Sequence, residues 1–391
     1  MHTVLTLSHT VLSLSLSLSP SLVLLLSTMS SGKLSDAFKS HPIFLHKQHP
    51  DDFSSLQELP ESYAWTSQLN EYPSFESLSC SESVPVIDLA DPNVVELVGH
   101  ACKTWGMFQA TNHGVPQKLV DDMESTVRSL FSLPPQQKLK AARLPDGISG
   151  YGFHRISAFC EKLMWSESFT IVGSPLQHFC QLWPQDHTKF CCVTEEYEKE
   201  MKRLAARLMW LMLGSLGISK EDIKWAGPRG EFEDASAALQ LNSYPACPDP
   251  DRTMGLAQHT DSNLLSIIHQ SAKASGLQVF QEGKDEGRGW LMVPPVPGAF
   301  VINVGDFIHI LSNGLYQTPL HRAVVNRSQH RVSVAYLYGP PENAQVSPLS
   351  KLLGPNCPPL YAPVTWNEYL GTKAKLNNKA LQSLRLNAPL N

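Results

Sequence analysis

The stretch from Asn242 to Tyr338 constrains the fold of this chain more than any other. Within it His259 and Asp261 stand two residues apart, and His321 follows sixty residues after Asp261. Side chains at positions i and i+2 of a strand point to the same face, so this spacing suits two groups that converge on one ion. The third group must then come from a strand paired nearby, which a β barrel or a β sandwich supplies. We therefore expect such a structure around these residues.

Strand patterns dominate the second half of the chain, and helical patterns are prominent in the first. From residue 237 onward, apolar runs of four to eight residues are separated by Gly, Pro and Asn, which is typical of short strands. Apolar residues recur at helical spacing in residues 94–105, in residues 118–131 and in residues 195–216, with Thr194 as the N-cap of the third helix; a final helix is expected over residues 366–384. We therefore expect an α+β fold, in which a double-stranded β-helix (a jelly-roll, cupin-like core) carries flanking helices.

The chain divides into four segments by composition and pattern. Residues 1–28 form a low-complexity Leu/Ser extension, whose longest uninterrupted apolar run, Leu22–Leu26, is far shorter than a membrane span. A signal peptide and a plastid transit peptide are alternatives for this extension, but the simplest interpretation is an extended start, with Met29 opening the remainder. That remainder comprises a mixed helical region with short strands (29–235), the jelly-roll domain (236–345) and a helical cover (346–391).

His259, Asp261 and His321 are the donor set of a non-haem Fe(II) site. Two histidines and one carboxylate occupy one face of an octahedron and leave the remaining positions of the metal open for substrates. The same donors also bind zinc, so a zinc hydrolase is an alternative. The other histidines in or near these motifs fit no such spacing and are interpreted as structural or surface residues: His113, His269, His309 and His330.

Arg331 and Ser333 repeat the two-residue spacing in a strand-like segment. A guanidinium group binds a carboxylate through two parallel hydrogen bonds, and a serine hydroxyl can donate a further one. Together with Tyr244, these residues could hold the far carboxylate of a dicarboxylic acid whose 2-oxo acid end binds iron. A zinc hydrolase would leave this Arg-x-Ser pattern unexplained.

These motifs resemble those of the plant 2-oxoglutarate- and Fe(II)-dependent dioxygenases: N-x-Y (Asn242 and Tyr244), H-x-D, a distal histidine and R-x-S. The resemblance covers roughly residues 84–370. It is strongest to the gibberellin 3-beta-dioxygenases, in segments such as SDAFKSHP, KLMWSESFTIVGSPL, MGLAQHTDS and VTWNEYLGTKA.

The resemblance implies both cofactors and residue roles. Fe(II) would be held by the two histidines and the aspartate, 2-oxoglutarate would be the co-substrate, and ascorbate would serve as reductant. Arg331 would be the catalytic residue, and the co-substrate would be bound by Asn242, Tyr244, Arg331 and Ser333. The implied reaction is 3β-hydroxylation of a gibberellin precursor to a bioactive gibberellin, with release of succinate and CO2.

Other functions remain open at this level. A gibberellin 2-oxidase, a gibberellin 20-oxidase or a flavonoid oxygenase would share the iron and co-substrate motifs, and a non-catalytic jelly-roll protein could bind a hormone. The aromatic-rich stretch from Tyr151 to Trp183 could form the apolar wall that a rigid diterpenoid acid needs.

Charge and cysteine content favour a cytoplasmic enzyme of small molecules. The net charge of −5 offers no basic footprint for nucleic acid. The eight cysteines show no C-x-x-C or zinc-type spacing, so reduced thiols are expected. We expect a cytoplasmic monomer that binds dioxygen and a gibberellin, with neither nucleic acid nor membrane as a partner.

Overall fold

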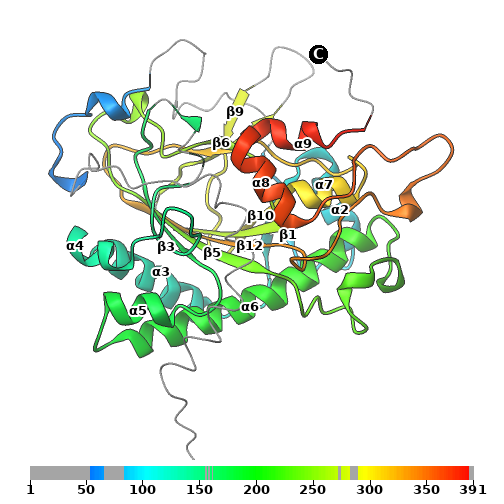
Figure 1. The fold of residues 1–391 in the computed structure, drawn as a ribbon, viewed down its shortest axis with the longest axis horizontal. Helices are drawn as coiled ribbons and strands as arrows, with labels where there is room; N and C mark the ends of the chain where they lie inside the picture. Colours follow the sequence, from blue (N-terminus) through cyan, green and yellow to red (C-terminus); the bar gives the residue numbers. More distant parts are fainter. Residues whose placement is uncertain are drawn as a thin grey trace, which may run out of the picture.

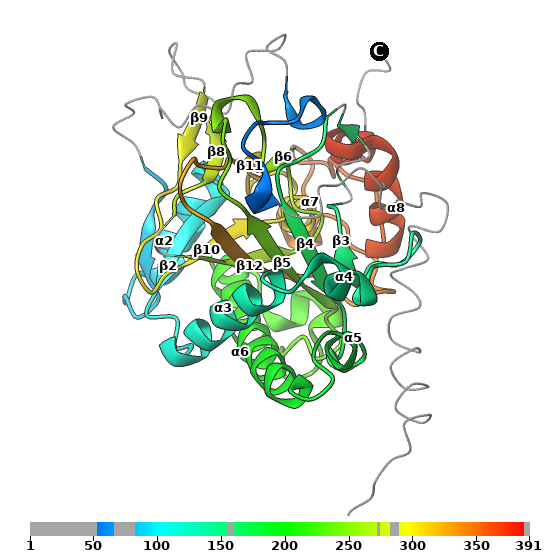
Figure 2. The same ribbon diagram turned by 90° about the vertical axis from the view of Figure 1, so that its left-hand side faces the viewer.

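Two β-sheets face each other across the middle of the molecule, and helices cover the outer face of the larger sheet (Figures 1 and 2). The computed structural model describes residues 53–65 and 83–386, except for residues 155, 157–158, 161, 272–273 and 282–288. The predicted extension, residues 1–28, and the proposed start at Met29 lie outside the described residues. Within the described ranges, no helix is long and apolar enough to cross a membrane.

The larger sheet contains eight strands in the order β1-β2-β10-β7-β12-β5-β4-β3, and the smaller contains four in the order β6-β11-β8-β9. In the larger sheet β1 and β2 are parallel, and the other paired strands of both sheets are antiparallel. The strands are β1 (Val86–Asp88), β2 (Met107–Thr111), β3 (Gly150–Gly152), β4 (Glu167–Ile171), β5 (Ala237–Tyr244), β6 (Leu256–His259), β7 (Leu265–Gln270), β8 (Leu277–Gln281), β9 (Gly289–Met292), β10 (Phe300–Val304), β11 (His321–Ala323) and β12 (Arg331–Tyr338).

Strands from both halves of the sequence share the larger sheet. Four of its members, β1 to β4, precede residue 235, whereas β5, β7, β10 and β12 follow it. Hydrogen bonds join β4 directly to β5. The predicted boundary between residues 235 and 236 therefore lies beside a strand of a continuous sheet, and the segment boundaries stay predictions.

The two longest helices pack on one side of the larger sheet, where α6 runs along the bottom of Figure 1. The helices are α2 (Val94–Thr104), α3 (Gln117–Phe131), α4 (Pro135–Lys138), α5 (Leu176–Leu182), α6 (His187–Gly214), α7 (Asp306–Leu311), α8 (Trp366–Leu376) and α9 (Ala380–Ser383). The main hydrophobic core contains buried side chains of α3, α5 and α6 together with residues of β5, β7 and β12.

Strict alternation along β12 separates this core from the space between the sheets. Its odd-numbered residues, from Arg331 to Leu337, line a cavity. Its even-numbered residues, from Val332 to Tyr338, are buried in the core that includes the helices. Because successive side chains of a strand point to opposite faces, one strand contributes to both regions, and a shift of register by one residue would exchange them.

Two predicted helices differ in extent from the observed ones. α6 begins at His187, eight residues before the predicted start at Glu195. Thr194 is not its N-cap: the Thr194 hydroxyl donates to the Phe190 carbonyl oxygen at 2.9 Å inside the helix, as threonine does in mid-helix positions. The added first turns are held by packing, since the rings of Phe190 and Trp183 stack 3.9 Å apart.

The C-terminal helix is interrupted rather than continuous. α8 begins at Trp366, as predicted, with Thr365 and Glu368 forming a capping box. It ends at Leu376 because Asn377 has a φ of 46°, in the left-handed region that a helix cannot contain. A short 3-10 turn and α9 complete the segment that was predicted as one helix.

Candidate active site

The side chains of His259, Asp261 and His321 meet at one point between the two sheets. β6 and β11 are adjacent antiparallel strands, and their register places His259 directly opposite His321. The Oδ1 atom of Asp261 lies 3.8 Å from His259 Nε2 and 3.7 Å from His321 Nε2. One potential ligand atom from each residue lies within 4.8 Å of the others, so the cluster can hold a metal ion.

Asp261 reaches this cluster from a turn rather than from a strand. β6 ends at His259, so the predicted i, i+2 placement on one strand is wrong for the aspartate. Two hydrogen bonds orient the Asp261 side chain instead: its Oδ2 accepts from Ser266 Oγ at 2.7 Å and from Asn303 Nδ2 at 3.1 Å. Oδ1 is the oxygen nearest both imidazoles and is available to a metal ion.

Each histidine has its outer ring nitrogen bonded to the backbone. Nδ1 of His259 lies 2.8 Å from the Ala257 carbonyl oxygen, and Nδ1 of His321 lies 3.0 Å from that of Pro319. Since a carbonyl only accepts, Nδ1 carries the hydrogen in both rings and Nε2 presents its lone pair to the cluster. This is the orientation and tautomer that a metal-binding histidine requires.

The electrostatics of the cluster suit metal binding. Burial lowers the pKa of His259 to about 4, and the neighbouring His321 contributes to the shift. Burial alone would raise the pKa of Asp261, but the two imidazoles and the hydrogen bonds from Ser266 and Asn303 hold it below its usual value. The cluster thus contains a carboxylate and a neutral imidazole at His259, which are the protonation states of metal ligands.

Asp306 ties the C-terminal helix to the turn that carries Asp261. The Asp306 side chain is fully buried, and its backbone N–H donates to the Asp261 carbonyl oxygen at 2.8 Å. Lys373 of α8 lies 2.9 Å from Asp306 Oδ2 and also donates to the Thr260 hydroxyl oxygen at 2.7 Å. The other hydrogen-bond donors to the Asp306 carboxylate are the hydroxyl groups of Thr260, Thr318 and Tyr369.

Arg331 lies at one end of β12, fully enclosed by the protein. Only 3% of its surface is exposed, and its guanidinium stands 5.0 Å from the centre of the Tyr244 ring. Its Nη2 donates to Gln270 at 3.0 Å, whereas Nε and Nη1 have no hydrogen-bond partner in the described structure. Unsatisfied buried donors are costly, and a carboxylate beside Nη1 would offset part of that cost.

Gly276 provides the space for this guanidinium. A Cβ at Gly276 would lie 2.7 Å from the Val324 carbonyl oxygen and 3.0 Å from Cδ of Arg331. Any larger residue would therefore push against the arginine side chain or the adjacent backbone. The close approach of this segment fixes where Arg331 can lie.

The remaining predicted co-substrate residues face the same space. β5 and β12 pair so that Arg331 lies opposite Tyr244 and Ser333 lies opposite Asn242. Nδ2 of Asn242 donates to Ser333 Oγ at 3.2 Å. Because that oxygen accepts from the amide, its own hydrogen is available to a ligand in the cavity.

One cavity of about 310 Å³ connects the metal cluster, Arg331 and an apolar region. From Arg331 to Leu337 the cavity-facing side of β12 spans about 20 Å, at about 3.4 Å per residue. The apolar lining includes Ile148, Ile156, Val172, Ala238, Ile268, Leu277, Leu337 and Leu370. The cavity thus offers separate places for a carboxylate, a metal ion and a largely apolar molecule.

Comparison with known proteins identifies this arrangement. The model of the 2OG-Fe(II) oxygenase superfamily matches residues 235–340, and that of the "non-haem dioxygenase in morphine synthesis N-terminal" matches residues 84–186. Gibberellin 3-beta-dioxygenase 1 of Pisum sativum is 59% identical over 362 residues, which are 92% of this chain and 95% of that protein. The chain belongs to the gibberellin 3-beta-dioxygenase family of 2OG-Fe(II) oxygenases.

Other members of this superfamily agree in sequence and structure. Gibberellin 3-beta-dioxygenase 2 of Arabidopsis thaliana is 53% identical, with 91% of this chain and 99% of that protein covered. The crystal structure of JOX2 in complex with 2OG, Fe and JA has a TM-score of 0.73 and 30% identity, and the match covers 85% of this chain and 95% of that one. The predicted jelly-roll fold and family are therefore confirmed.

The residues present fit the two cofactors that 2OG-Fe(II) oxygenases use. The cluster supplies two imidazole nitrogens and one carboxylate oxygen, which is the donor set that Fe(II) oxygenases employ. The unsatisfied guanidinium N–H groups of Arg331 suit the carboxylate of 2-oxoglutarate. As a member of the family, this protein is an oxygenase that uses Fe(II) and 2-oxoglutarate.

The four histidines that fit no ligand spacing are held in hydrogen bonds by other residues. His269 bonds to Glu124 at 2.8 Å, and His330 bonds to Ser243 at 2.9 Å. Nδ1 of His309 bonds to the Tyr316 carbonyl oxygen at 2.6 Å. His113 lies 2.9 Å from the Gly298 carbonyl oxygen. These hydrogen bonds support the prediction that the four are structural or surface residues.

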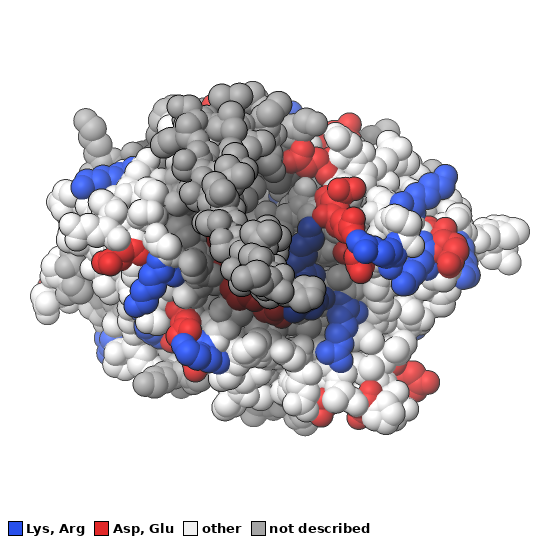
Figure 3. Space-filling view, turned by 90° about the horizontal axis from the view of Figure 1, so that it is seen from below, with Lys and Arg blue, Asp and Glu red and all other residues white. Residues whose placement is uncertain are grey.

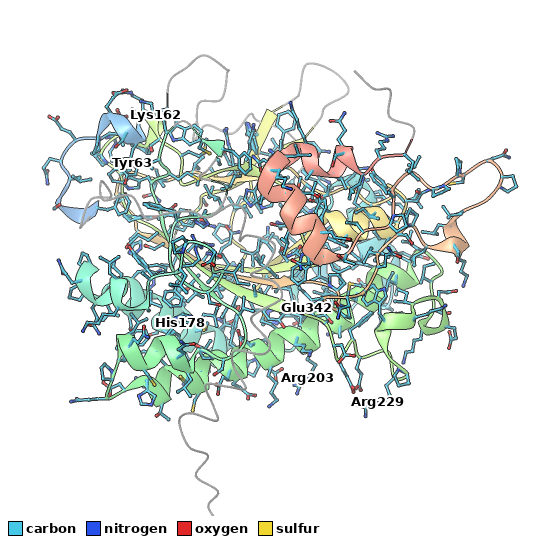
Figure 4. The ribbon with its side chains drawn as sticks, in the orientation of Figure 1. Tyr63, Lys162, His178, Arg203, Arg229 and Glu342 are labelled. Atoms are coloured by element: carbon cyan, nitrogen blue, oxygen red, sulfur yellow. The ribbon has the colours of Figure 1, made fainter. Side chains whose placement is uncertain are left out.

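The predicted aromatic wall is replaced by a mostly aliphatic one. Among the described residues from Tyr151 to Trp183, those that line the cavity are His154, Ile156, Thr170 and Val172. Trp165 is fully buried, in edge-to-face contact with Phe53 and Tyr63, whose ring centres are 4.7 and 5.3 Å away. Figure 4 labels Tyr63 in this aromatic cluster.

Sequence reasoning missed the residues that orient the site: Ser266, Gln270, Asn303 and Asp306. A usable signal was present for Asn303, which is a polar residue inside the otherwise apolar, fully buried strand β10. Ser266 and Gln270 likewise interrupt the apolar run of β7. Buried polar side chains need hydrogen-bond partners, so each of them pointed to a partner elsewhere in the chain.

Proposed function

We propose that the protein hydroxylates a gibberellin precursor at its 3β position and thereby forms a bioactive gibberellin. The observation that carries this proposal is a single cavity containing the His-Asp-His cluster, the buried Arg331 and an apolar lining. The substrate follows from the relatives, since a gibberellin 3-beta-dioxygenase is 59% identical over 92% of the chain. The balanced reaction consumes dioxygen and 2-oxoglutarate and releases succinate and CO2.

In this proposal His259, Asp261 and His321 hold Fe(II). The two imidazoles bind through Nε2, because their Nδ1–H groups are engaged with backbone carbonyls. Asp261 binds through Oδ1, because its other oxygen is held by Ser266 and Asn303. When bound, Fe(II) together with 2-oxoglutarate and dioxygen supplies the oxidising power to hydroxylate an unactivated C–H bond.

Arg331 is proposed to bind the far carboxylate of 2-oxoglutarate. In the proposed complex Nη1 donates to the carboxylate, while the hydrogen bond to Gln270 keeps Nη2 in place. Ser333 adds a hydrogen bond, with its hydroxyl oriented by Asn242, and Tyr244 completes the pocket below the guanidinium. These groups fix one end of the co-substrate, which leaves its 2-oxo acid end directed to the metal cluster.

The apolar lining is proposed to position the gibberellin and to exclude water. Ile156, Val172 and Leu337 offer no hydrogen bonds to a bound molecule, so contact area and shape determine how the rigid ring system lies. The position of that ring system selects the carbon to be hydroxylated.

Product analysis tests the proposal. Purified protein is incubated with Fe(II), 2-oxoglutarate, ascorbate, and a panel of gibberellins lacking a 3-hydroxyl group and of flavanones. The expected result is a 3β-hydroxylated gibberellin, matched to an authentic standard, with one succinate released per product. Exclusive 2β-hydroxylation, oxidation at C-20, or turnover of flavanones alone would contradict it. Absence of oxygen-dependent succinate release would instead favour a zinc hydrolase or a non-catalytic hormone-binding protein.

We also propose that the enzyme is a cytoplasmic monomer without a nucleic acid or membrane partner. Acidic and basic side chains are interspersed on the face in Figure 3, which supports the absence of a nucleic acid partner. The described cysteines are all free thiols, which suits a reducing compartment. Light scattering of the purified protein and imaging of a fluorescent fusion test the oligomeric state and the compartment.

A further inference from the structure

The cavity contains an arginine that neither cofactor needs. Four Arg and Asp residues line it within the described part of the chain: Arg143, Asp261, Arg322 and Arg331. Asp261 faces the proposed metal, and Arg331 faces the proposed 2-oxoglutarate. Arg322 is engaged by the protein, because its Nε donates to Gln278 at 2.8 Å and its guanidinium lies 4.0 Å from the centre of the Trp290 ring. Arg143 is left without a role.

Arg143 is held in place at the edge of the larger sheet. Its backbone N–H donates to the Tyr151 carbonyl oxygen at 2.8 Å, next to the bridge between Ala142 and Tyr151. Gly150, with a φ of 115°, permits this approach, since a Cβ there would lie 2.7 Å from the Ala141 carbonyl oxygen. The guanidinium donates through Nη2 to the carbonyl oxygen of Phe153.

The charge of Arg143 is not compensated by an acidic side chain in the described structure. Its guanidinium forms no salt bridge with a carboxylate among the residues described. Burial lowers the pKa of Arg143 to about 10, so the group still carries its charge at neutral pH. Removing an unpaired cation from water is unfavourable, and an anionic ligand would offset that cost.

The surroundings of Arg143 are those of the apolar part of the cavity. β4 pairs with β5 so that Thr170 lies opposite Gln240, and both side chains line the cavity. Gln240 precedes Tyr244 by four residues on β5. Ile148, Ile156 and Val172 line the same space. A molecule placed there meets aliphatic groups, the polar side chains of Thr170 and Gln240, and one guanidinium. Arg331 lies beside Tyr244, four residues along β5 from Gln240.

We propose that Arg143 binds the carboxylate of the substrate and so selects an apolar carboxylic acid. This inference rests on the proposed function, because a gibberellin is a rigid, mostly apolar diterpenoid acid. A planar guanidinium can bind a carboxylate through two parallel hydrogen bonds, which would fix the orientation of the ring system relative to the metal cluster. Uncharged flavanones lack this anchor, so Arg143 also discriminates against the main alternative substrate class.

Arg143→Met, Arg143→Lys and a matched surface control test the assignment. Arg203→Met removes the same charge from the outer side of α6, where the Arg203 side chain is 65% exposed and points away from the sheet (Figure 4). Each protein is assayed with a gibberellin lacking a 3-hydroxyl group, as the free acid and as its uncharged methyl ester. The KM for 2-oxoglutarate is measured in parallel.

We expect Arg143→Met to raise the KM for the free acid by about 10- to 100-fold, which corresponds to the loss of one charged hydrogen bond. The KM for the methyl ester and that for 2-oxoglutarate stay unchanged, Arg143→Lys lies between, and Arg203→Met resembles the wild type. If the ratio of the acid KM to the ester KM in Arg143→Met is the same as in the wild type, the assignment is overturned. An equal rise of both KM values is one such result, and it indicates a structural role for Arg143. Failure of the wild type to hydroxylate any gibberellin contradicts the proposed function, and the Arg143 assignment with it.

Discussion

The two faces of the larger sheet are built from the same strands but differ in the polarity of their buried side chains. On the helix side, residues such as Leu241 and Val334 are fully buried among apolar neighbours. On the cavity side, their sequence neighbours Asn242 and Ser333 are also buried but polar, and they hydrogen-bond to each other. Burial alone therefore does not distinguish a packing residue from a functional one.

The difference lies in what each face leaves unsatisfied. The helix side is closed by side-chain packing, and the buried atoms without partners there include the neutral hydroxyl groups of Tyr197 and Tyr338. On the cavity side, the buried donors without partners in the described structure include Nε and Nη1 of a cationic side chain, Arg331. Such donors lower the free energy of unfolding until a ligand pairs with them. The cavity side is therefore less stable without its ligands than with them. Substitutions on the two faces should accordingly affect different measurements.

The largest effect is expected from Asp261→Ala on the cavity side. Loss of the proposed carboxylate ligand should reduce hydroxylation below detection, while circular dichroism and the midpoint of thermal unfolding remain close to those of the wild type. Asp251→Ala, which changes an exposed aspartate, is the control and should remain active. Wild-type-like turnover in Asp261→Ala would refute the ligand assignment.

Arg331→Lys should separate charge from geometry at the other end of the cavity. Lysine keeps the positive charge but loses the planar fork, so the KM for 2-oxoglutarate should rise by about 10- to 100-fold, the loss of one charged hydrogen bond. Initial rates at varied 2-oxoglutarate provide the measurement. An unchanged KM would count decisively against Arg331 as the anchor.

Asn303→Ala tests a residue that orients a ligand without binding the metal itself. Its amide donates to Asp261 Oδ2, and loss of such a partner typically weakens metal affinity by about 10- to 100-fold. The Fe(II) concentration that gives half-maximal activity should increase accordingly, with activity recovered at high Fe(II). If that concentration does not change, Asn303 has no part in orienting the aspartate.

Leu241→Ala should show the opposite behaviour on the helix side. The side chain is fully buried, and truncation of a core leucine lowers the free energy of unfolding by about 2–5 kcal/mol. The KM values for 2-oxoglutarate and for the gibberellin should stay at wild-type levels, since Leu241 faces away from the cavity. Denaturant titration and steady-state kinetics on one preparation compare the two. A selective increase in either KM would break the distinction between the faces.

The smallest effect is expected from removing residues that the structure does not describe. A shortened protein that begins at Met29 lacks the low-complexity residues 1–28, which lie outside the described structure. It should be soluble and retain full activity with unchanged KM values. Loss of activity in the shortened protein, with the full chain active, would show that this extension matters for catalysis.

Local spacing in the sequence was sufficient to predict which residues the structure brings together around the cavity. Arg331 and Ser333 share a face because strand alternation depends only on neighbouring residues. The position of Asp261 in a turn was not predictable in this way, because Ser266 and Asn303 hold it through tertiary contacts. The early start of α6 was missed for a similar reason, since packing of Phe190 on Trp183 outweighed the N-cap signal of Thr194.

The cavity wall was the least predictable part. Composition drew attention to aromatic residues such as Trp165, but an aromatic ring fills a core as readily as it lines a pocket. Arg143 stands in no recognisable motif, and its relation to the cavity depends on the pairing of residues near β3 with β4 and β5. Such long-range pairings are not encoded in short sequence patterns.

The bond between Asp306 and Lys373 has a consequence for genetics. A premature stop codon between positions 340 and 365 would leave every proposed iron and 2-oxoglutarate residue encoded but would remove α8. Asp306 would then lose the lysine that neutralises it, and breaking a buried ion pair costs about 3–5 kcal/mol. Alleles truncated this late in the coding sequence should therefore behave as null alleles, even though their transcripts preserve the complete set of catalytic codons.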